Sequence, residues 1–581
     1  MSQEPAEAIE VTLFRQILMV PFAIEATDAR DTRLLRGRDR VVRLAELLRA
    51  PWEEITERRW RHLPTDDLAT GDDLAAAYAE FVYFEPYAQR FLYGAAGDNA
   101  TDSPIRLWRR RDITALDLAV QLGAEHPLEQ YRLRVDRLSF YAFDTGNAFL
   151  VVEVAFDPGL AAKLPDADAD LPKLAQVQTV VERLRRVFPP YFAPFDTAGK
   201  SLDRLAAPLF PVSLRWVTGD PEQAPPDFAP DELMLAEHFT GFVEEHRVPP
   251  MHARWRELIA DMPLEGFPES CKDCTVRLSQ LGDDRAFSMT ILGVDDPSRI
   301  AEADWVRLAM CDEPGENWPY SPTFLEGWER KHGYDRHFDK DTGHHTRFLV
   351  SAYSFAMVGK ALRPDDEAFC PYRDIFAGHG RRHYFQLCLI AYFQKAALLT
   401  LSERLADAMR LEGSSGGKSA HAIEADILQF THRYWFESLS AQIQAQEIFD
   451  RLRDNLRLRQ LYEQVRREVR EADAFATSTE QQRIARNQNR LNVIAGVGLT
   501  LAVVVGVFGM NVFDDTRHPH WSIDIFTLTA VGGFLLAGFA ALYIWADALE
   551  GWFGARRRWR WAMVGIPFVL GGGGLLGMLF R

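Results

Sequence analysis

Hydrophobic residues gather at the carboxyl end of the chain, in three long runs. The runs at 493–513 and 525–546 contain no charged residue, whereas the third, at 561–580, is interrupted by Pro567 and four glycines. Twenty-one helical residues at ~1.5 Å rise cover about 31 Å, the thickness of a hydrocarbon core. We therefore predict transmembrane helices at 493–513 and 525–546. We also expect 561–580 to span the membrane, with an interfacial or re-entrant segment as the alternative.

Arginines indicate the orientation of these runs. The loop 514–524 holds a single basic residue, Arg517, whereas clusters precede the first run and follow the second. Because cytoplasmic loops are enriched in Lys and Arg, both clusters and the large upstream part should be cytoplasmic. The predicted protein is thus a multi-pass protein of the inner (plasma) membrane. The clusters are Arg483, Arg486 and Arg490, and Arg556, Arg557, Arg558 and Arg560.

The segment before the first run predicts a very long helix. Residues 418–495 contain neither glycine nor proline and are rich in strong helix formers. Apolar residues recur at three- and four-residue steps, from Ala445 through Leu452, Leu458 and Val465 to Phe475. This pattern predicts a helix from near Asp450 to Met510, with an ordinary antiparallel bundle as the alternative. Such a helix would carry a cytoplasmic change to the membrane.

The rest of the chain alternates between strand and helix patterns. Residues 132–157 predict a β-hairpin with its turn at 145–147, and 287–294 and 347–356 predict further strands. Helices are expected at 174–187 and 383–411, the latter ended by a Gly/Ser-rich stretch. We therefore expect a cytoplasmic α/β domain over 1–375 and a helical collar and stalk over 376–492.

Composition and charge exclude several classes. The 581 residues carry a net charge of −17, which disfavours non-specific nucleic-acid binding. Residues 480–581 hold nine basic and six acidic side chains, net +3, which leaves −20 for residues 1–479. Five cysteines, an odd number, argue against a disulfide scaffold and favour a reducing compartment.

Catalytic signals are weak. No phosphate-binding loop, dinucleotide fingerprint or nucleophile elbow is present, so we expect no enzyme activity. Cys271 and Cys274 have zinc-ligand spacing but lack a second pair. The histidines between 332 and 345 fit a polar surface loop better than a metal or nuclease site.

The first apolar run ends in Phe508-Gly509-Met510-Asn511. A Gly-Met-Asn triplet at the outer end of the first of two closely spaced carboxyl-terminal spans resembles the CorA family of divalent-cation transporters. The residue before the triplet is usually tyrosine there, and Phe508 keeps the ring without the hydroxyl. The resemblance covers about 450–546 and implies a pentameric funnel with very long stalk helices. The first 370 or so residues exceed the usual family length.

The resemblance implies a selectivity filter at Gly509, Met510 and Asn511. Five Asn511 carboxamides would ring the entrance and recognise hydrated Mg²⁺ through its waters. The alternative is that Asn511 only caps the helix. Residues three or four positions apart, counted back from Asn511, share one face of a helix. By resemblance to the family's pore helix, this face would line the pore, and its leucines would form apolar constrictions. The predicted pore-lining set is Gly506, Ala502, Leu499, Ala495, Leu491 and Gln488.

The external loop adds the cation-attracting residues Asp514, Asp515 and Asp524, and it also contains His518 and His520. Histidine suits Zn²⁺, Ni²⁺ or Co²⁺ better than Mg²⁺. The related ZntB branch, linked to zinc, shares the architecture, so the identity of the metal stays open.

The leading hypothesis is therefore a homopentameric channel for divalent cations, Mg²⁺ first, gated from the cytoplasmic domain, with the cations as substrate and regulator. The alternative is a membrane-anchored sensor or effector, in which the large N-terminal domain binds a ligand and the CorA-like end is the output.

Overall fold

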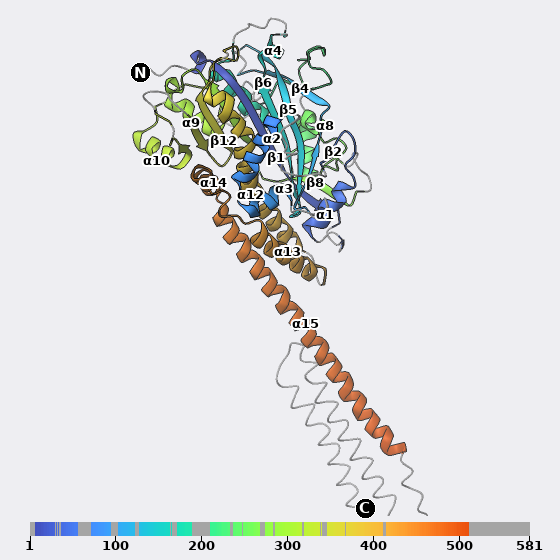
Figure 1. Cartoon of the computed structure of the whole chain (residues 1–581). Coiled ribbons are helices and arrows are strands. Elements are labelled where there is room, and N and C mark those ends of the chain that lie inside the picture. Colours follow the sequence, from blue (N-terminus) through green and yellow to red (C-terminus); the bar gives the residue numbers. More distant parts are fainter. Residues whose placement is uncertain are drawn as a thin grey trace, which may run out of the picture. The chain divides into compact units, whose positions relative to one another are not determined.

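The computed structural model divides into two compact units, Met1–Asp473 and Ala474–Arg581, and the boundary falls inside the helix α15 (Leu458–Gly509) (Figure 1). The residues that the structure describes are 6–28, 31, 33, 36–55, 71–94, 103–122, 127–162, 164, 171–188, 210–232, 236–246, 248–267, 274–282, 285–316, 319–336, 338–339, 346–366, 368–410 and 414–509.

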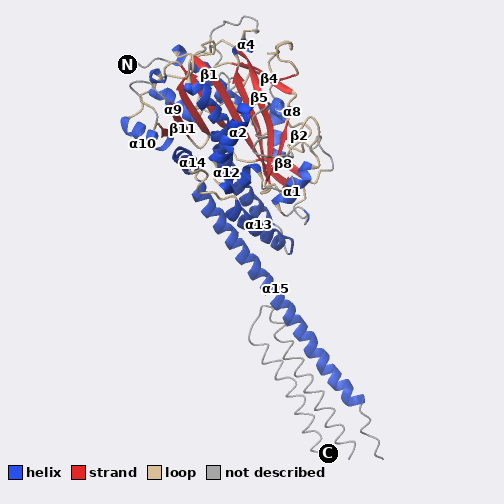
Figure 2. Cartoon of the chain, in the orientation of Figure 1, coloured by secondary structure: helices blue, strands red, loops and turns tan. Residues whose placement is uncertain are grey.

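A single twelve-stranded sheet is the centre of unit 1 (Figure 2). Its main path runs β10-β11-β12-β9-β1-β6-β5-β3-β2, while β4 joins β5 to β7 and β8 pairs with β1. The described pairs are antiparallel except for β9 and β12, which are parallel. The strands are β1 (Val11–Ala26), β2 (Glu53–Glu54), β3 (Ile105–Arg109), β4 (Ile113–Val120), β5 (Glu129–Phe143), β6 (Asn147–Phe156), β7 (Ser213–Thr218), β8 (Val276–Gln280), β9 (Phe287–Val294), β10 (Gly333–Tyr334), β11 (Thr346–Val350) and β12 (Ser354–Lys360).

Helices cover both faces of this sheet. Successive side chains of a strand point to opposite faces, and in β1 Ile17 and Met19 enter one core cluster while Leu18 and Val20 enter the other. The first cluster contains residues of α3, α12, α13, α14 and the start of α15, and the second contains residues of α1, α5, α8 and α9. The helices are α1 (Gly37–Ala45), α2 (Gly71–Tyr83), α3 (Pro86–Tyr93), α4 (Pro158–Ala161), α5 (Leu174–Leu184), α7 (Ala236–His246), α8 (Ala253–Glu257), α9 (Glu302–Met310), α10 (Pro322–His332), α11 (Ala377–His379), α12 (Phe385–Arg410), α13 (Ser414–Arg433), α14 (Ile443–Asn455) and α15. Short 3-10 turns stand at Ala6–Ala8 and Pro297–Arg299.

The hairpin predicted from alternation is confirmed, because β5 and β6 pair antiparallel around a turn at 144–146. The strand at 287–294 is also confirmed as β9. A single strand over 347–356 was the wrong prediction, since the chain turns back between β11 and β12. The Ser351 hydroxyl accepts hydrogen bonds from the backbone N–H groups of Tyr353 and Ser354, both at 3.1 Å, which stabilises this turn.

The apolar helix predicted at 383–411 is confirmed as α12, which ends at Arg410, just before the Gly/Ser-rich stretch. Helix α13 nevertheless begins at Ser414, within that stretch, and includes two of its glycines. Ile423, Ile427 and Phe430 of α13 are buried in the same core cluster as α12. Tertiary packing of these residues outweighs the weak helix propensity of glycine and serine.

The predicted helix from near Asp450 is interrupted. α14 ends at Asn455, and Arg457 has a positive φ of 56° before α15 begins at Leu458. Leu456 and Leu458 on either side of the break are both buried in the core. Since Arg457 is neither glycine nor asparagine, no local signal announced this left-handed residue.

Among the described residues, one helical segment, Tyr372–Arg410, is long and apolar enough to cross a membrane. It consists of the π-helical turns Tyr372–Phe376 and Gly380–Tyr384, the short helix α11 between them, and α12. Because 83% of its apolar window is buried inside the protein, it has the character of a core helix. The runs at 525–546 and 561–580 lie outside the described residues, and of 493–513 only the part up to Gly509 is described.

One glycine of the sheet leaves room for an aromatic ring. A Cβ atom on Gly359 would stand 2.2 Å from Cδ2 of Tyr372, whose hydroxyl donates to the Met357 carbonyl at 2.7 Å. We expect Gly359→Ala to destabilise the protein by about 1–3 kcal/mol, because the buried ring must move. A Cβ on Gly327 in α10 meets nothing within 4 Å, so Gly327→Ala is the matched control. Thermal unfolding followed by near-ultraviolet circular dichroism checks this. Equal midpoints for the two variants would contradict the tight contact.

Candidate functional site

The predicted pore residues up to Gly509 all lie in α15, where steps of three and four place them on one helical face. Gln488, Leu491 and Ala495 are exposed, Leu491 at 65%. Gly509 is the last described residue, so Met510, Asn511 and the three loop aspartates lie outside the described residues. The side chains at 499, 502 and 506 are likewise not described. The filter, pore and loop assignments therefore stay predictions.

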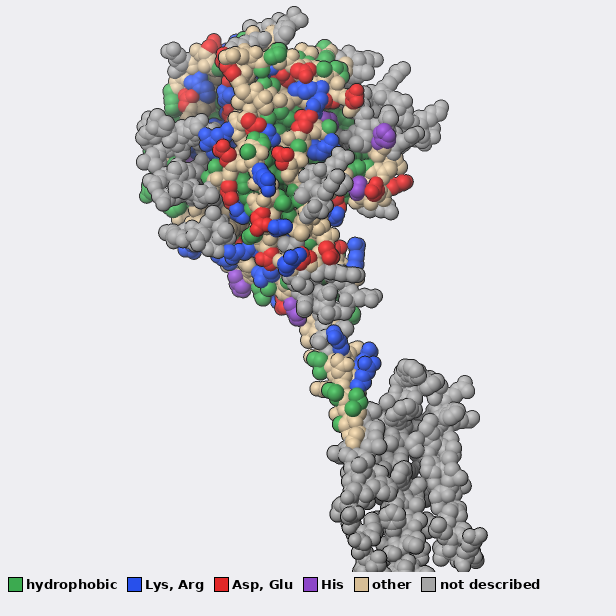
Figure 3. All heavy atoms as spheres, turned by 90° about the vertical axis from the view of Figure 1, so that its right-hand side faces the viewer, with side chains coloured by type: hydrophobic (Ala, Val, Ile, Leu, Met, Phe, Trp, Pro, Cys, Tyr) green, Lys and Arg blue, Asp and Glu red, His purple; other side chains and the backbone are tan. Residues whose placement is uncertain are grey.

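The described part of unit 2 exposes apolar side chains on its helix. Ile484 is 47% exposed and Ile494 is 68% exposed, and they are interspersed with exposed arginines (Figure 3). Helices on the surface of globular proteins normally turn such large apolar side chains toward the core. By contrast, the face of unit 1 drawn in Figure 3 mixes acidic and basic side chains, so its acidic excess forms no single-signed surface there.

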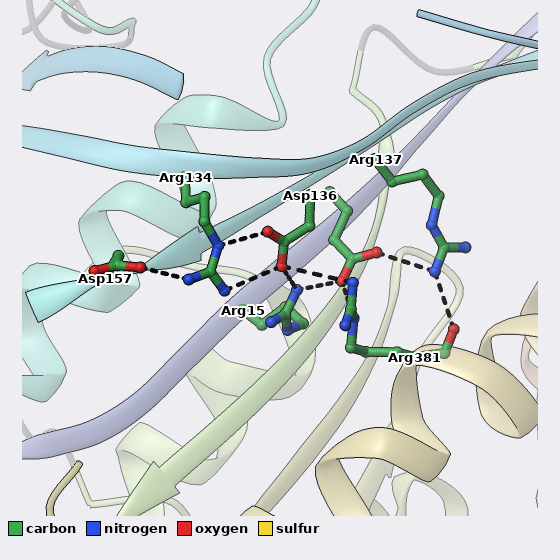
Figure 4. A network of polar contacts seen from close by, with 7 residues as sticks. Arg15, Arg134, Asp136, Arg137, Asp157 and Arg381 are labelled. Atoms are coloured by element: carbon green, nitrogen blue, oxygen red, sulfur yellow. Dashed lines mark hydrogen bonds and ion pairs between the residues drawn. The ribbon is translucent and has the colours of Figure 1, made fainter. Parts of the chain in front are cut away.

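A polar network of the described residues joins the sheet to the helices that cover it (Figure 4). At its centre the fully buried Glu153 of β6 binds Nη2 of Arg137 at 3.0 Å. The same arginine nitrogen donates to the backbone carbonyl of Arg381, in the π-helical turn before α12, at 3.1 Å. Arg15 and Arg381 also bind Glu153, and Arg134 binds Asp136 at 2.6 Å. The members are Arg15, Arg134, Asp136, Arg137, Glu153, Asp157 and Arg381.

Electrostatics decide what this network can do. Burial alone would raise the pKa of Glu153, but Arg137, Arg381 and Arg15 outweigh it and lower this pKa to about 2. The pKa of Asp136 is lowered as well, since its arginine partners outweigh its burial. Both carboxylates are therefore ionised at neutral pH and do not exchange protons there. The network acts as a structural clamp between β1, β5, β6 and the π-helical turn before α12.

A β-bulge, which no sequence pattern announced, builds this clamp. The register of β5 against β6 shifts between Val135 and Arg137, so that Arg137 stands opposite Glu153. A bulge of this kind re-aims one side chain relative to its strand. The sequence offered one indication of a buried polar network, though not of the bulge. Arginine and aspartate alternate densely with apolar residues over 132–137, which is unusual for a core strand.

The structure describes one residue of each weak metal candidate from the sequence, the cysteine pair at 271 and 274 and the histidines between 332 and 345. Cys274 is disulfide-bonded, so in this structure it offers no thiolate to zinc. Cys311, Cys370 and Cys388 are free and buried. His332 is the one described member of the four-histidine group, and its Nδ1 lies 2.8 Å from the Val350 carbonyl oxygen. Burial lowers the pKa of His332, which favours a neutral, structural ring.

Side chains that could hold a metal ion come together elsewhere, at His421, Glu424 and Asp473. Sequence reasoning missed this group, because Asp473 lies about fifty residues after His421 and Glu424 in the chain. The resemblance to the CorA family rests on the motif at 508–511 and its position. In comparisons with known proteins, no family model, no curated protein and no solved structure matches this chain.

Proposed function

We propose that this protein is a homopentameric membrane channel for divalent metal cations, with Mg²⁺ as the main substrate, selected at a ring of Asn511 side chains. The observation that carries the proposal is α15, which is helical over 52 residues up to the last described residue, the glycine of the Gly-Met-Asn triplet. Helices of globular proteins average only about 11–12 residues. A helix of this length, exposed over its described part beyond residue 473, favours a stalk that becomes a membrane span.

The surface of α15 supports the same proposal. Leu491 and Ile494 are more than half exposed in a single chain. Such side chains are covered when several copies pack together or when lipid surrounds them. One helix cannot enclose a pore, so a ring of copies is the arrangement in which one face of α15 lines a path for ions.

The place where α15 begins supports gating from the cytoplasmic side. Its first turns contribute Leu458, Tyr462 and Val465 to the core of unit 1. A change in the packing of that core would displace a helix whose other end carries the predicted filter. Leu491 and Leu499 would then act as apolar constrictions that conduct only when hydrated.

The test is uptake of Mg²⁺, Co²⁺, Ni²⁺ and Zn²⁺ into liposomes containing the purified full-length protein. We expect Mg²⁺ uptake well above that of protein-free vesicles and, after chemical cross-linking, a particle of five chains. Absence of uptake for all four ions would reject the channel.

The size of unit 1 favours one alternative, a membrane-anchored sensor whose large domain binds a ligand. A truncation cannot separate the two, because α12 shares its core with strands between residues 11 and 360, and removal of these strands would expose that helix. The uptake assay separates them by what controls the flux. A sensor with a CorA-like output pore conducts only when its large domain has bound a ligand, whereas the proposed channel conducts when divalent cations alone are supplied.

A further inference from the structure

We propose that His421, Glu424 and Asp473 form a binding site for a transition-metal ion of the Zn²⁺, Co²⁺ and Ni²⁺ class, which fastens α13 to the part of α15 that belongs to unit 1. All three residues belong to unit 1. The proposal concerns a resident site in this unit and does not depend on the proposed transport.

The two helices that supply the donors are held together by packing that is independent of the donors. The Thr431 hydroxyl lies 3.2 Å from the Tyr462 hydroxyl, and the rings of Trp435 and Tyr462 stack with centroids 4.4 Å apart. His421 precedes Thr431 by ten residues in α13, and its partner Asp473 follows Tyr462 by eleven residues in α15. The helices therefore run antiparallel, and the donors meet because the register of the helix pair places them there.

The spacing of the donor atoms fits one ion. Nδ1 of His421 lies 3.3 Å from Oδ1 of Asp473 and 3.8 Å from Oε2 of Glu424. One ligand atom from each residue lies within 4.8 Å of the other two. With metal–ligand bonds of ~2.1 Å, neighbouring ligands of a tetrahedral ion are about 3.4 Å apart. The 3.3 Å between His421 and Asp473 matches this spacing, and the 3.8 Å between His421 and Glu424 is slightly longer.

The donor types select the class of metal. An imidazole nitrogen with two carboxylate oxygens suits Zn²⁺, Co²⁺ or Ni²⁺ rather than Mg²⁺, which prefers oxygen ligands throughout. His421 and Glu424 are three residues apart on α13 and so share one helical face. The side chain of His421 is 63% exposed and that of Asp473 is 32% exposed, which lets an ion enter and lets water complete the coordination.

Charge within the group also favours a divalent ion. A protonated His421 would balance only one of the two carboxylates. A divalent cation balances both, with the imidazole neutral and acting as a ligand. The competing interpretation is an exposed ion pair with no affinity for metal, which the experiment below distinguishes.

The experiment titrates Co²⁺ into metal-free, full-length protein in detergent and follows the visible absorption bands that report coordination by nitrogen and oxygen ligands. We expect one saturable Co²⁺ site per chain that His421→Ala removes, and that Zn²⁺ displaces. Loss of a ligand should weaken binding at this site by at least about 100-fold, since even supporting partners are worth about 10–100-fold. The predicted external loop also carries histidines that could bind Co²⁺. The quantity compared is therefore the difference in bound Co²⁺ between the wild type and His421→Ala.

His432→Ala is the matched control, since this exposed histidine lies on the same helix outside the group. Asp473→Asn is a second variant that keeps the side-chain shape, so loss of the site in both variants with unchanged circular dichroism supports the assignment. Zn²⁺ should raise the thermal midpoint of the wild type and of His432→Ala but not that of the two site variants. Identical Co²⁺ titrations for wild type and His421→Ala would overturn the proposal and leave an exposed ion pair only.

Discussion

Replacement of Asn511 by alanine is expected to reduce divalent-cation uptake into liposomes by at least about tenfold. A hydrogen bond to a charged partner contributes about 1.5–3 kcal/mol, and about 1.4 kcal/mol corresponds to a factor of ten. In a ring of five chains the loss occurs at five positions at once. Alanine offers no carbonyl oxygen to the waters of the ion, so the entry site loses its recognition element while the helix persists.

The control for this prediction is Asn492→Ala, an exposed asparagine of α15 outside the predicted pore-lining set. It should conduct like the wild type when the same amount of protein is reconstituted. Asn511→Gln keeps the amide on a longer side chain and should retain part of the uptake. Unchanged uptake by Asn511→Ala would show that Asn511 is no filter, and the cap of a helix terminus would then describe this residue better.

The second large effect is expected from Glu153→Gln in the buried clamp. This change removes the negative charge that Arg15, Arg137 and Arg381 share and leaves the three guanidinium groups without it. Removal of one partner from a buried ion pair costs about 3–5 kcal/mol. We therefore expect a thermal midpoint several degrees below that of the wild type at neutral pH, measured on the full-length protein in detergent.

The pH dependence of this effect has a definite sign. The pKa of Glu153 is about 2 in the folded protein against an ordinary value of 4.5. The unfolded chain therefore binds more protons, and the contribution of Glu153 to stability is complete above pH 4.5. It disappears as the pH falls through about 2. The difference between wild type and Glu153→Gln should thus be largest above pH 4.5 and shrink as the solution is acidified.

An exposed pair gives the matched control. Glu326 of α10 pairs with Arg330 at 3.6 Å, and both side chains are more than three-quarters exposed. The same chemical change, Glu326→Gln, should alter stability by at most about 1 kcal/mol, because water and salt screen such a pair. Equal shifts for the two glutamates would mean that the clamp contributes no more than a surface contact.

Elements with a strong local period could be predicted closely. The strand β9 and the hairpin of β5 and β6 follow from alternation, which depends on neighbouring residues alone. The break at Arg457 and the helical glycines after Ser414 could not be predicted, because buried leucines and the packing of α13 against α12 outweigh local propensity there. The bulge beside Arg137 likewise depends on the partner strand.

For the candidate sites the division is similar. The Gly-Met-Asn motif, the apolar runs and the arginine clusters can be read from the sequence, since they are contiguous or periodic. The described residues end at Gly509, so the predicted filter stays a prediction. The clamp around Glu153 and the meeting of His421 with Asp473 depend on strand register and on the antiparallel packing of two helices.

The sequence by itself determined the strongly periodic elements and predicted a membrane end, its orientation and a filter, because each depends on residues close together along the chain. Only the tertiary structure decided the strand order, the clamp and the metal group. Their partners are separated by many residues in the sequence, and the packing free energy that selects them is a property of the whole core.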